Sequence, residues 1–175
     1  NMWNTELGKI KVETNNLSDK KIFYSALYHT MIAPSLFNDF NGDYRGADKQ
    51  VHQNPGYQTY TTFSLWDTYR AAHPLFTLVQ PNRVNDFVNT MLAIYDQQGK
   101  LPVWHLHANE TNCMVGYHAI PVLADAYLKG FRGFDVDKAF EAMKASALND
   151  FRGVDFVKSQ GYIPADSQNE SVARA

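Results

Sequence analysis

The sequence predicts an all-α protein made of antiparallel helical hairpins. About six segments place apolar residues at the i, i+3, i+4 spacing of a helix, and no segment offers a convincing run of alternating strand residues. Polar loops separate pairs of these segments. Paired helices of this length are typical of a helical toroid or solenoid, in which each hairpin packs against the next.

Apolar spacing and end signals justify each expected helix in turn. Ser18 is a good N-cap for a helix that Pro34 ends. The most regular helix carries apolar residues at six helical positions between 84 and 95, and Gly99 is its expected C-terminal cap. Asp135 should cap a later helix. The expected helices cover residues 2–12, 18–31, 62–79, 82–98, the apolar segment that follows Asn109, and 135–147, with a short turn of helix at 151–159.

Composition limits the class of protein. The chain has 175 residues, which is enough for one domain with a sizeable core. Its net charge is −2, so nothing indicates binding to nucleic acid or to an anionic membrane, and no apolar run is long enough to span a bilayer. The single cysteine, Cys113, excludes an internal disulfide framework.

The chemistry of the chain is concentrated between residues 101 and 130. This stretch opens with two histidines at alternate positions, His105 and His107, and turns through Glu110 into a segment that is apolar on almost every side. A helix without a polar face should be buried inside a larger body. Because the segment also carries His118 and Asp125, a buried site with ionisable groups at its mouth is the simplest interpretation.

Glu110 has two interpretations. Next to Asn109 as a helix cap, its carboxylate is an ordinary first-turn charge worth about 0.3–1 kcal/mol. Alternatively it is a general acid, which would require burial or a neighbouring carboxylate to keep it protonated. His105 and His107 would point to one side of a strand, but they lack a third ligand at motif spacing, so no metal ligands are assigned.

The segment from 62 to 79 carries a second candidate site. Trp66 and Arg70 share one face of the expected helix, and Asp67 lies three residues before Arg70. The structural interpretation is a surface ion pair, worth only about 0.3–0.5 kcal/mol. The functional interpretation is a sugar platform, in which an indole face is edged by a carboxylate and a guanidinium.

Four blocks of the chain resemble consecutive blocks of glycoside hydrolase family 92, which comprises calcium-dependent exo-acting α-mannosidases. They are IFYSALYHTMIAPSLFNDFNGDYRG, YTTFSLWDTYRAAHPLFTLVQP, LPVWHLHANETNCMVGYHAIPVLADAYLKG and GYIPAD with NESVARA. The resemblance covers residues 21 to 171. It implies an (α/α)6 barrel as the catalytic domain, preceded by a β-sandwich. The chain would then be a partial catalytic domain over residues 1–175, forming about half of the barrel, with the remaining helices and the β-sandwich elsewhere in the parent chain.

The resemblance also implies a mechanism and a set of residues. Family members invert the anomeric centre: a glutamic acid protonates the leaving oxygen, an aspartate base activates water, and Ca2+ grips the sugar. Glu110, in the NET segment, is the match for the acid, and the base would lie beyond Ala175. Asn169-Glu170 stands where the family has a His-Glu pair that contacts the leaving sugar, and His105 stands where many members carry glutamate; both departures bear on linkage specificity. The expected substrate contacts are Trp66, Asp67, Arg70, His105, His118, Asn169 and Glu170.

The expected function is therefore that of a piece of an inverting exo-α-mannosidase acting on terminal, α-1,2-linked mannose of glycans, in the periplasm or outside the cell. A non-catalytic helical sugar-binding or interaction module is the alternative, and a toroid lyase acting on uronates is a third. His105 and His118 could instead be satisfied core histidines. We further expect exposed apolar surface on the open side of the half barrel, convergence of Trp66, Asp67, Arg70 and Glu110 on one concavity, and burial of Phe63, Val88, Leu92, Val115, Val122 and Phe140.

Overall fold

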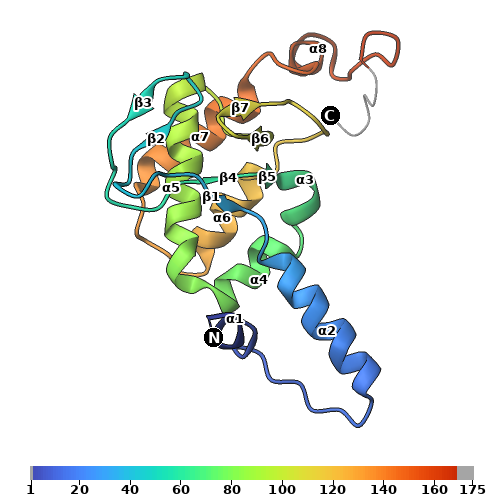
Figure 1. Cartoon of the computed structure of the whole chain (residues 1–175). Helices are drawn as coiled ribbons and strands as arrows, with labels where there is room; N and C mark the ends of the chain where they lie inside the picture. The colour runs from blue at the N-terminus through green and yellow to red at the C-terminus, as the bar shows by residue number, and fades with distance from the viewer. Residues whose placement is uncertain (1, 169–175) are drawn as a thin grey trace.

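The computed structural model describes residues 2–168 and has a mixed α/β fold (Figure 1). The prediction of an all-α protein is wrong, because seven short strands accompany the helices in this part of the chain. Each strand has only two or three residues, too few to display the alternation by which a strand is recognised in a sequence. The helices are α1 (Met2–Leu7), α2 (Leu17–Thr30), α3 (Leu65–Thr68), α4 (Ala72–Val79), α5 (Pro81–Gln98), α6 (Ala119–Leu128), α7 (Val136–Leu148) and α8 (Val154–Gln160).

The strands form three small antiparallel sheets. β1 (Ser35–Leu36) pairs with β4 (Tyr60–Thr61), and β2 (Tyr44–Arg45) pairs with β3 (Val51–His52). The third sheet has the order β5-β6-β7, with bounds Phe63–Ser64, Trp104–Leu106 and Asn109–Glu110. This last sheet joins two segments about forty residues apart in the sequence, and it carries the candidate acid on β7.

Helix α5 is the centre of the packing, with α4, α6 and α7 against it (Figure 1). Pro81 occupies its first position, where the missing N–H has no helical partner to lose, and Gly99 ends it with a left-handed φ of 77°. The predicted end at Gln98 and the cap at Gly99 are confirmed, and the helix starts one residue before the predicted Asn82. The cap predicted at Asp135 is also confirmed, since its side chain accepts a hydrogen bond from the Lys138 amide, whereas Asn16, and not Ser18, caps α2.

Two predicted helices are each interrupted before a proline. The single helix expected over residues 62–79 is β5, the short α3, a turn and then α4. The helix expected after Asn109 begins only at Ala119. Pro74 and Pro121 are the third residues of α4 and α6, where a proline removes no helical hydrogen bond, although either would break a helix that continued upstream.

The core lies between the central helices and the β5-β6-β7 sheet. Phe63, Val88, Leu92, Val115 and Val122 are buried as predicted. Phe140 is not, because 60% of its surface is exposed. Its spacing along α7 is correct for an apolar face, but no described element covers that side of the helix.

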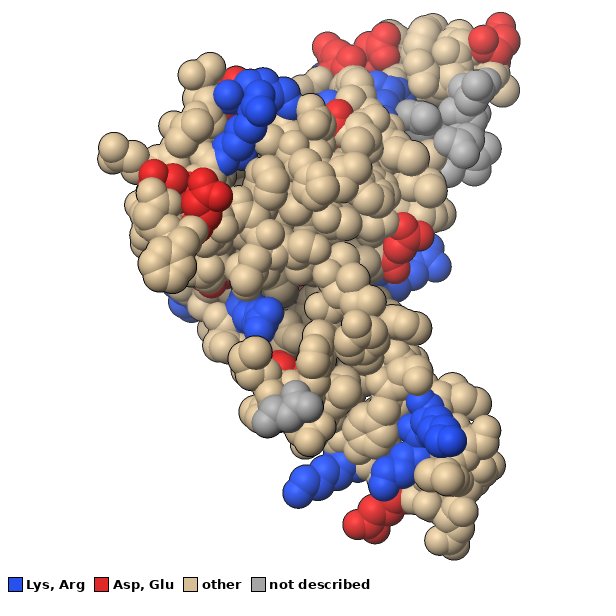
Figure 2. Space-filling model, viewed as in Figure 1, with Lys and Arg blue, Asp and Glu red and all other residues tan. Residues whose placement is uncertain are grey.

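An apolar groove between α6 and α7 accounts for part of the exposed apolar surface that we expected. Its volume is about 390 Å3, and Tyr127, Leu128, Phe140 and Met143 are among the residues that line it. In the view of Figure 2, charged side chains form small mixed groups near the edges, with broad uncharged areas between them. No helix in the part of the chain that the structure describes combines the length and the apolar character needed to cross a bilayer.

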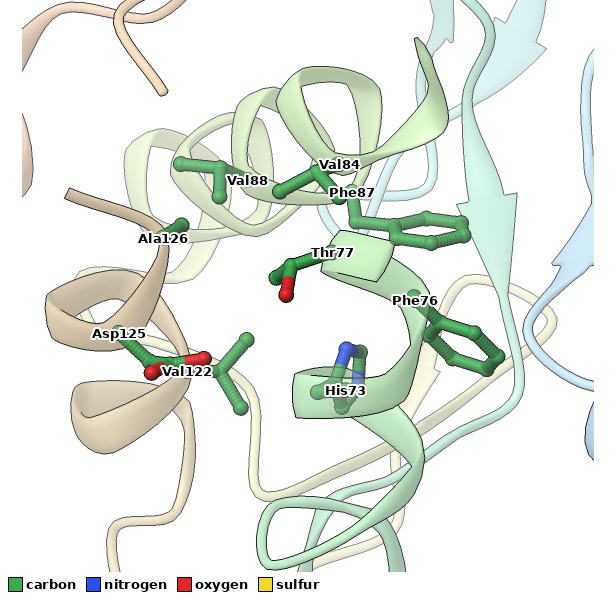
Figure 3. Close-up of a pocket in the computed structure, with 9 residues that line it drawn as sticks. All are labelled: His73, Phe76, Thr77, Val84, Phe87, Val88, Val122, Asp125 and Ala126. Atoms are coloured by element: carbon green, nitrogen blue, oxygen red, sulfur yellow. The ribbon is translucent and has the colours of Figure 1, made fainter. Parts of the chain in front are cut away.

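A small cavity between α4, α5 and α6 holds the buried His73 (Figure 3). The ring points into the cavity and stacks edge-on against Phe76 and Phe87, and its Nε2 has no hydrogen-bond partner among the described residues. Burial lowers the pKa of His73 from 6.5 to about 4. The folded protein therefore holds this histidine neutral at pH values where the unfolded chain would protonate it.

We predict that the chain loses stability as the pH falls from about 6.5 towards 4, and that His73 is one cause. In this window the unfolded state binds more protons than the folded state, so the free energy of unfolding decreases with decreasing pH, by roughly 1–3 kcal/mol for one such group. Urea unfolding at a series of pH values measures the slope. His73→Phe should flatten it, since the ring is replaced by one that does not titrate; the matched variant His29→Phe, at an exposed position, should keep the original slope. Equal slopes in all three proteins would contradict the prediction.

Candidate functional site

The β5-β6-β7 sheet brings the two candidate segments of the sequence side by side. Phe63 of β5 lies opposite His105 of β6, and His105 lies opposite Glu110 of β7. A two-residue turn, His107 and Ala108, joins β6 to β7 with φ values of 45° and 62°, which are typical of a type I′ hairpin turn. Glu110 therefore lies on a hairpin strand, and the prediction that it begins a helix is wrong.

The Glu110 carboxylate is held by three backbone amides. Oε2 accepts a hydrogen bond from the Val103 N–H at 2.7 Å, and Oε1 accepts from the N–H groups of Trp104 and Asn112, each at 2.9 Å. The donors come from the strand before the turn and from the loop after β7, so they fix the rotation of the carboxyl group. Oε1 is thus saturated by the protein, whereas Oε2 has a second acceptor position that no described residue occupies.

An aromatic cluster forms beside this sheet, on α3 and the start of α6. The His118 ring lies edge-on to Trp66, with 5.1 Å between ring centroids, and 4.1 Å from the Tyr69 ring. The Arg70 Nε donates to the Tyr69 hydroxyl at 2.6 Å. Trp66 is 38% exposed, so the cluster keeps an open aromatic surface next to a guanidinium. Burial lowers the pKa of His118, and a backbone hydrogen bond opposes that change.

Tyr69 is a member of this cluster that the sequence prediction missed. It belongs to the same LWDTYR segment as Trp66 and Arg70, so its signal was available. The pairing expected for Asp67 also differs: its carboxylate accepts a hydrogen bond from the Ser64 hydroxyl, and it forms no ion pair with Arg70 in the described structure. Asp67 thereby ties α3 to the end of β5.

His105 is buried inside the protein. Only 3% of its surface is exposed, and neither ring nitrogen has a hydrogen-bond partner among the described residues. Burial lowers its pKa to about 4, an effect that the nearby Glu110 opposes, so the ring is neutral at pH 7. Its location directly opposite Glu110 in the hairpin makes it a packing neighbour of that strand.

The structure brings Trp66, Arg70 and His118 together and places Glu110 in the sheet that adjoins them. No hydrogen bond or ring contact in residues 2–168 joins Glu110 to Trp66 or to Arg70, so convergence on one concavity stays a prediction. Asn169 and Glu170 lie outside the described residues. Among the residues that are described, no group of three or more His, Cys, Asp or Glu side chains could hold a metal ion.

Comparison with known proteins links this geometry to one family. The sequence profile described as "Glycosyl hydrolase family 92 catalytic domain" matches residues 1–175. A family GH92 alpha-mannosidase from Bacteroides thetaiotaomicron, also solved in complex with mannoimidazole, is 44% identical with a TM-score of 0.92, over 98% of this chain and 23% of that chain. A family GH92 inverting mannosidase from the same species is 32% identical with a TM-score of 0.82, over 93% of this chain and 23% of that chain.

A curated relative from the fungus Arthroderma benhamiae carries the description "Uncharacterized secreted glycosidase". It is 30% identical, and the match covers 93% of this chain and 18% of the relative. The chain thus spans less than a quarter of the length of each of these proteins.

Proposed function

Since the chain belongs to the catalytic domain of glycosyl hydrolase family 92, we propose that its parent protein is an inverting exo-α-mannosidase that removes terminal, α-1,2-linked mannose from glycans. The observation that carries the proposal is the geometry of Glu110: three amides fix its carboxyl group while one acceptor position on Oε2 stays open. A fixed carboxyl with one available oxygen meets the positional requirement for proton transfer to a leaving oxygen. The acid must also be kept protonated by burial or by a neighbouring carboxylate, which we expect in the complete site of the parent protein.

In the proposed reaction Glu110 protonates the glycosidic oxygen as the bond to the anomeric carbon breaks. A proton on Oε2 passes to the leaving sugar, and the carboxylate that remains is stabilised by the three amide donors. Water attacks the opposite face of the mannose and loses a proton to a second carboxylate. Inverting enzymes hold the two carboxyl groups roughly 6.5–9.5 Å apart to leave room for that water. We expect the second carboxylate in the rest of the parent chain.

The aromatic cluster is the proposed sugar-contact surface. The open face of Trp66 offers apolar contact for a sugar ring, and Arg70, oriented by Tyr69, offers N–H donors to its hydroxyl groups. His118 supports both rings from the side. His105 is the exception among the expected contacts: its burial favours an indirect role, as support for the strand that bears Glu110.

We propose further that the chain is the first part of an (α/α)6 catalytic domain whose remaining helices cover the groove beside Phe140, and that a β-sandwich domain completes the parent. The exposed apolar groove between α6 and α7 supports this arrangement. Secretion or a periplasmic location is proposed from the secreted fungal relative. A calcium requirement is proposed for the parent protein from its membership of the family.

The experiment is hydrolysis of α-1,2-, α-1,3- and α-1,6-linked mannobiosides by the full-length parent, followed by proton NMR. We expect mannose to be released fastest from the α-1,2 linkage and to appear first as the β-anomer, because attack from the opposite face inverts the configuration. A chelator should lower the rate, and added calcium should restore it. First appearance of the α-anomer would contradict inversion, and faster release from another linkage would contradict the α-1,2 assignment.

A further inference from the structure

The loop that follows Glu110 is held by residues that the proposed mechanism does not use. At its centre is Asn112, which has a left-handed backbone with φ of 51°. Its N–H donates to Glu110 Oε1 at 2.9 Å, and its side-chain oxygen accepts a hydrogen bond from the Lys100 Nζ, also at 2.9 Å. Its carbonyl accepts a hydrogen bond from the Arg152 guanidinium. Asn112 thus links the side chains of Lys100 and Arg152 to Oε1 of Glu110.

Lys100 is itself fixed in place. It follows Gly99 at the end of α5; the Gln98 side-chain amide donates to its carbonyl at 3.0 Å, and the next amide, of Leu101, donates to the buried Ser146 hydroxyl on α7. Its ammonium lies 3.7 Å from the centroid of the Phe151 ring, which is a favourable cation–π distance. Burial lowers the pKa of Lys100, and the negative charge of Glu110 opposes this, so the two groups interact electrostatically.

The other side of the loop is equally anchored. Arg152 is 9% exposed, and its guanidinium lies 5.3 Å from the same Phe151 ring. The Tyr117 hydroxyl donates to the Phe151 carbonyl at 3.2 Å, which joins this segment to the loop before α6. The Asn112 loop is therefore bound to the segment that follows α5 and to the residues before α8, and not only to its own hairpin.

We propose that Lys100 and Asn112 are positioning residues for Glu110. Asn112 fixes Oε1, so that Oε2 faces the leaving oxygen, and Lys100 holds the side chain of Asn112 in place. The proposal rests on the proposed function, since it assigns these residues to the acid step. The other titratable or charged groups near Glu110 are His105 on β6 and His107 in the hairpin turn. Lys49 donates to the Ala108 carbonyl and to the Asn109 side chain, and Arg152 donates to the Asn112 carbonyl.

The test uses the full-length parent with Lys100→Met, Lys100→Arg and Asn112→Gly, and with Lys129→Met as the matched control. Lys129 is the C-cap residue of α6, and its ammonium forms an ion pair with Asp125. The constants kcat and KM are measured for an alkyl mannoside and for an activated aryl mannoside. Thermal unfolding and circular dichroism of each variant establish that it is folded. The activated leaving group needs little protonation, so the ratio of the two rates isolates the acid step.

We expect Lys100→Met to lower the rate on the alkyl mannoside by about 10- to 100-fold, the scale of a misplaced catalytic group. The aryl rate should change much less. Lys100→Arg keeps a cationic donor for the Asn112 side-chain oxygen, so it should restore much of the alkyl rate.

Asn112→Gly keeps the left-handed backbone and the amide donor but removes the oxygen that Lys100 binds. It should reduce the alkyl rate at nearly constant KM and change the aryl rate much less. Lys129→Met should resemble the wild-type protein in every measurement.

The outcomes distinguish the positioning role of Lys100 and Asn112 from the proposed acid role of Glu110. If Glu110→Gln impairs both mannosides equally, the acid assignment fails, and the positioning role fails with it. If Glu110→Gln shows the acid pattern while folded Lys100→Met and Asn112→Gly keep the wild-type ratio of alkyl to aryl rates, the positioning proposal alone is overturned. Should Lys100→Met fail to fold, Asn112→Gly and Lys100→Arg decide the question by the same ratio.

Discussion

Glu110→Gln in the full-length parent should nearly abolish hydrolysis of mannosides with poor leaving groups while the protein stays folded. An amide keeps the shape of the side chain, and its oxygen can still accept from the amides of Trp104 and Asn112. It cannot deliver a proton to the leaving oxygen. General acid catalysis contributes typically ~10²–10⁴-fold, so a loss of that order is expected.

The measurement is the hydrolysis rate of an alkyl and of an activated aryl mannoside by wild-type and variant protein. The aryl substrate should lose much less, because its leaving group departs with little protonation. Glu141→Gln, at an exposed position on α7, is the matched control and should leave both rates unchanged. Equal losses on the two substrates in Glu110→Gln would remove Glu110 from the acid role. The 175-residue chain alone should turn over neither substrate, since the proposed base lies outside it.

Phe63→Ala should destabilise the chain by about 3–5 kcal/mol, the range for removing a fully buried aromatic ring. Phe63 is 1% exposed, lies opposite His105 in the sheet and stacks against His73 from α4, with 6.4 Å between ring centroids. Removing it leaves a cavity where the site-bearing sheet meets the helices. We therefore expect the loss of stability to be accompanied by loosening of β6 and β7.

Urea unfolding followed by circular dichroism measures this effect, and amide hydrogen exchange at β6 and β7 reports the local loosening. Phe40→Ala is the matched control: Phe40 is the same residue type but fully exposed, so its removal should cost little. If the two variants were equally stable, Phe63 would not be the core residue that the structure shows.

Some features of this protein depend only on local sequence, and these could be predicted. Apolar spacing and Gly99 define α5, and the Asp135 side chain caps α7. Both signals act within a few residues of the helix end. The family could also be recognised from the sequence, since the blocks that carry the resemblance are long and continuous. Its profile matches the whole chain.

The starts of α4 and α6, each two residues before a proline (Pro74 and Pro121), were only partly predictable from the sequence. Each proline was visible in the sequence, but apolar spacing on both sides suggested a continuous helix. A proline is compatible with the first turn and incompatible with the interior, so each residue marks where a helix starts. Weighing this rule above periodicity would have placed the beginnings of α4 and α6 correctly.

The candidate acid site was decided by the tertiary structure. β5, β6 and β7 have two or three residues each, too short for an alternating pattern, and β5 meets β6 across about forty residues of intervening chain. The surroundings of Glu110 follow from that pairing and from left-handed residues such as Asn112, neither of which periodicity detects. Burial of Phe140 failed as a prediction for a related reason: spacing identifies an apolar face, whereas only the neighbouring elements determine whether that face is covered.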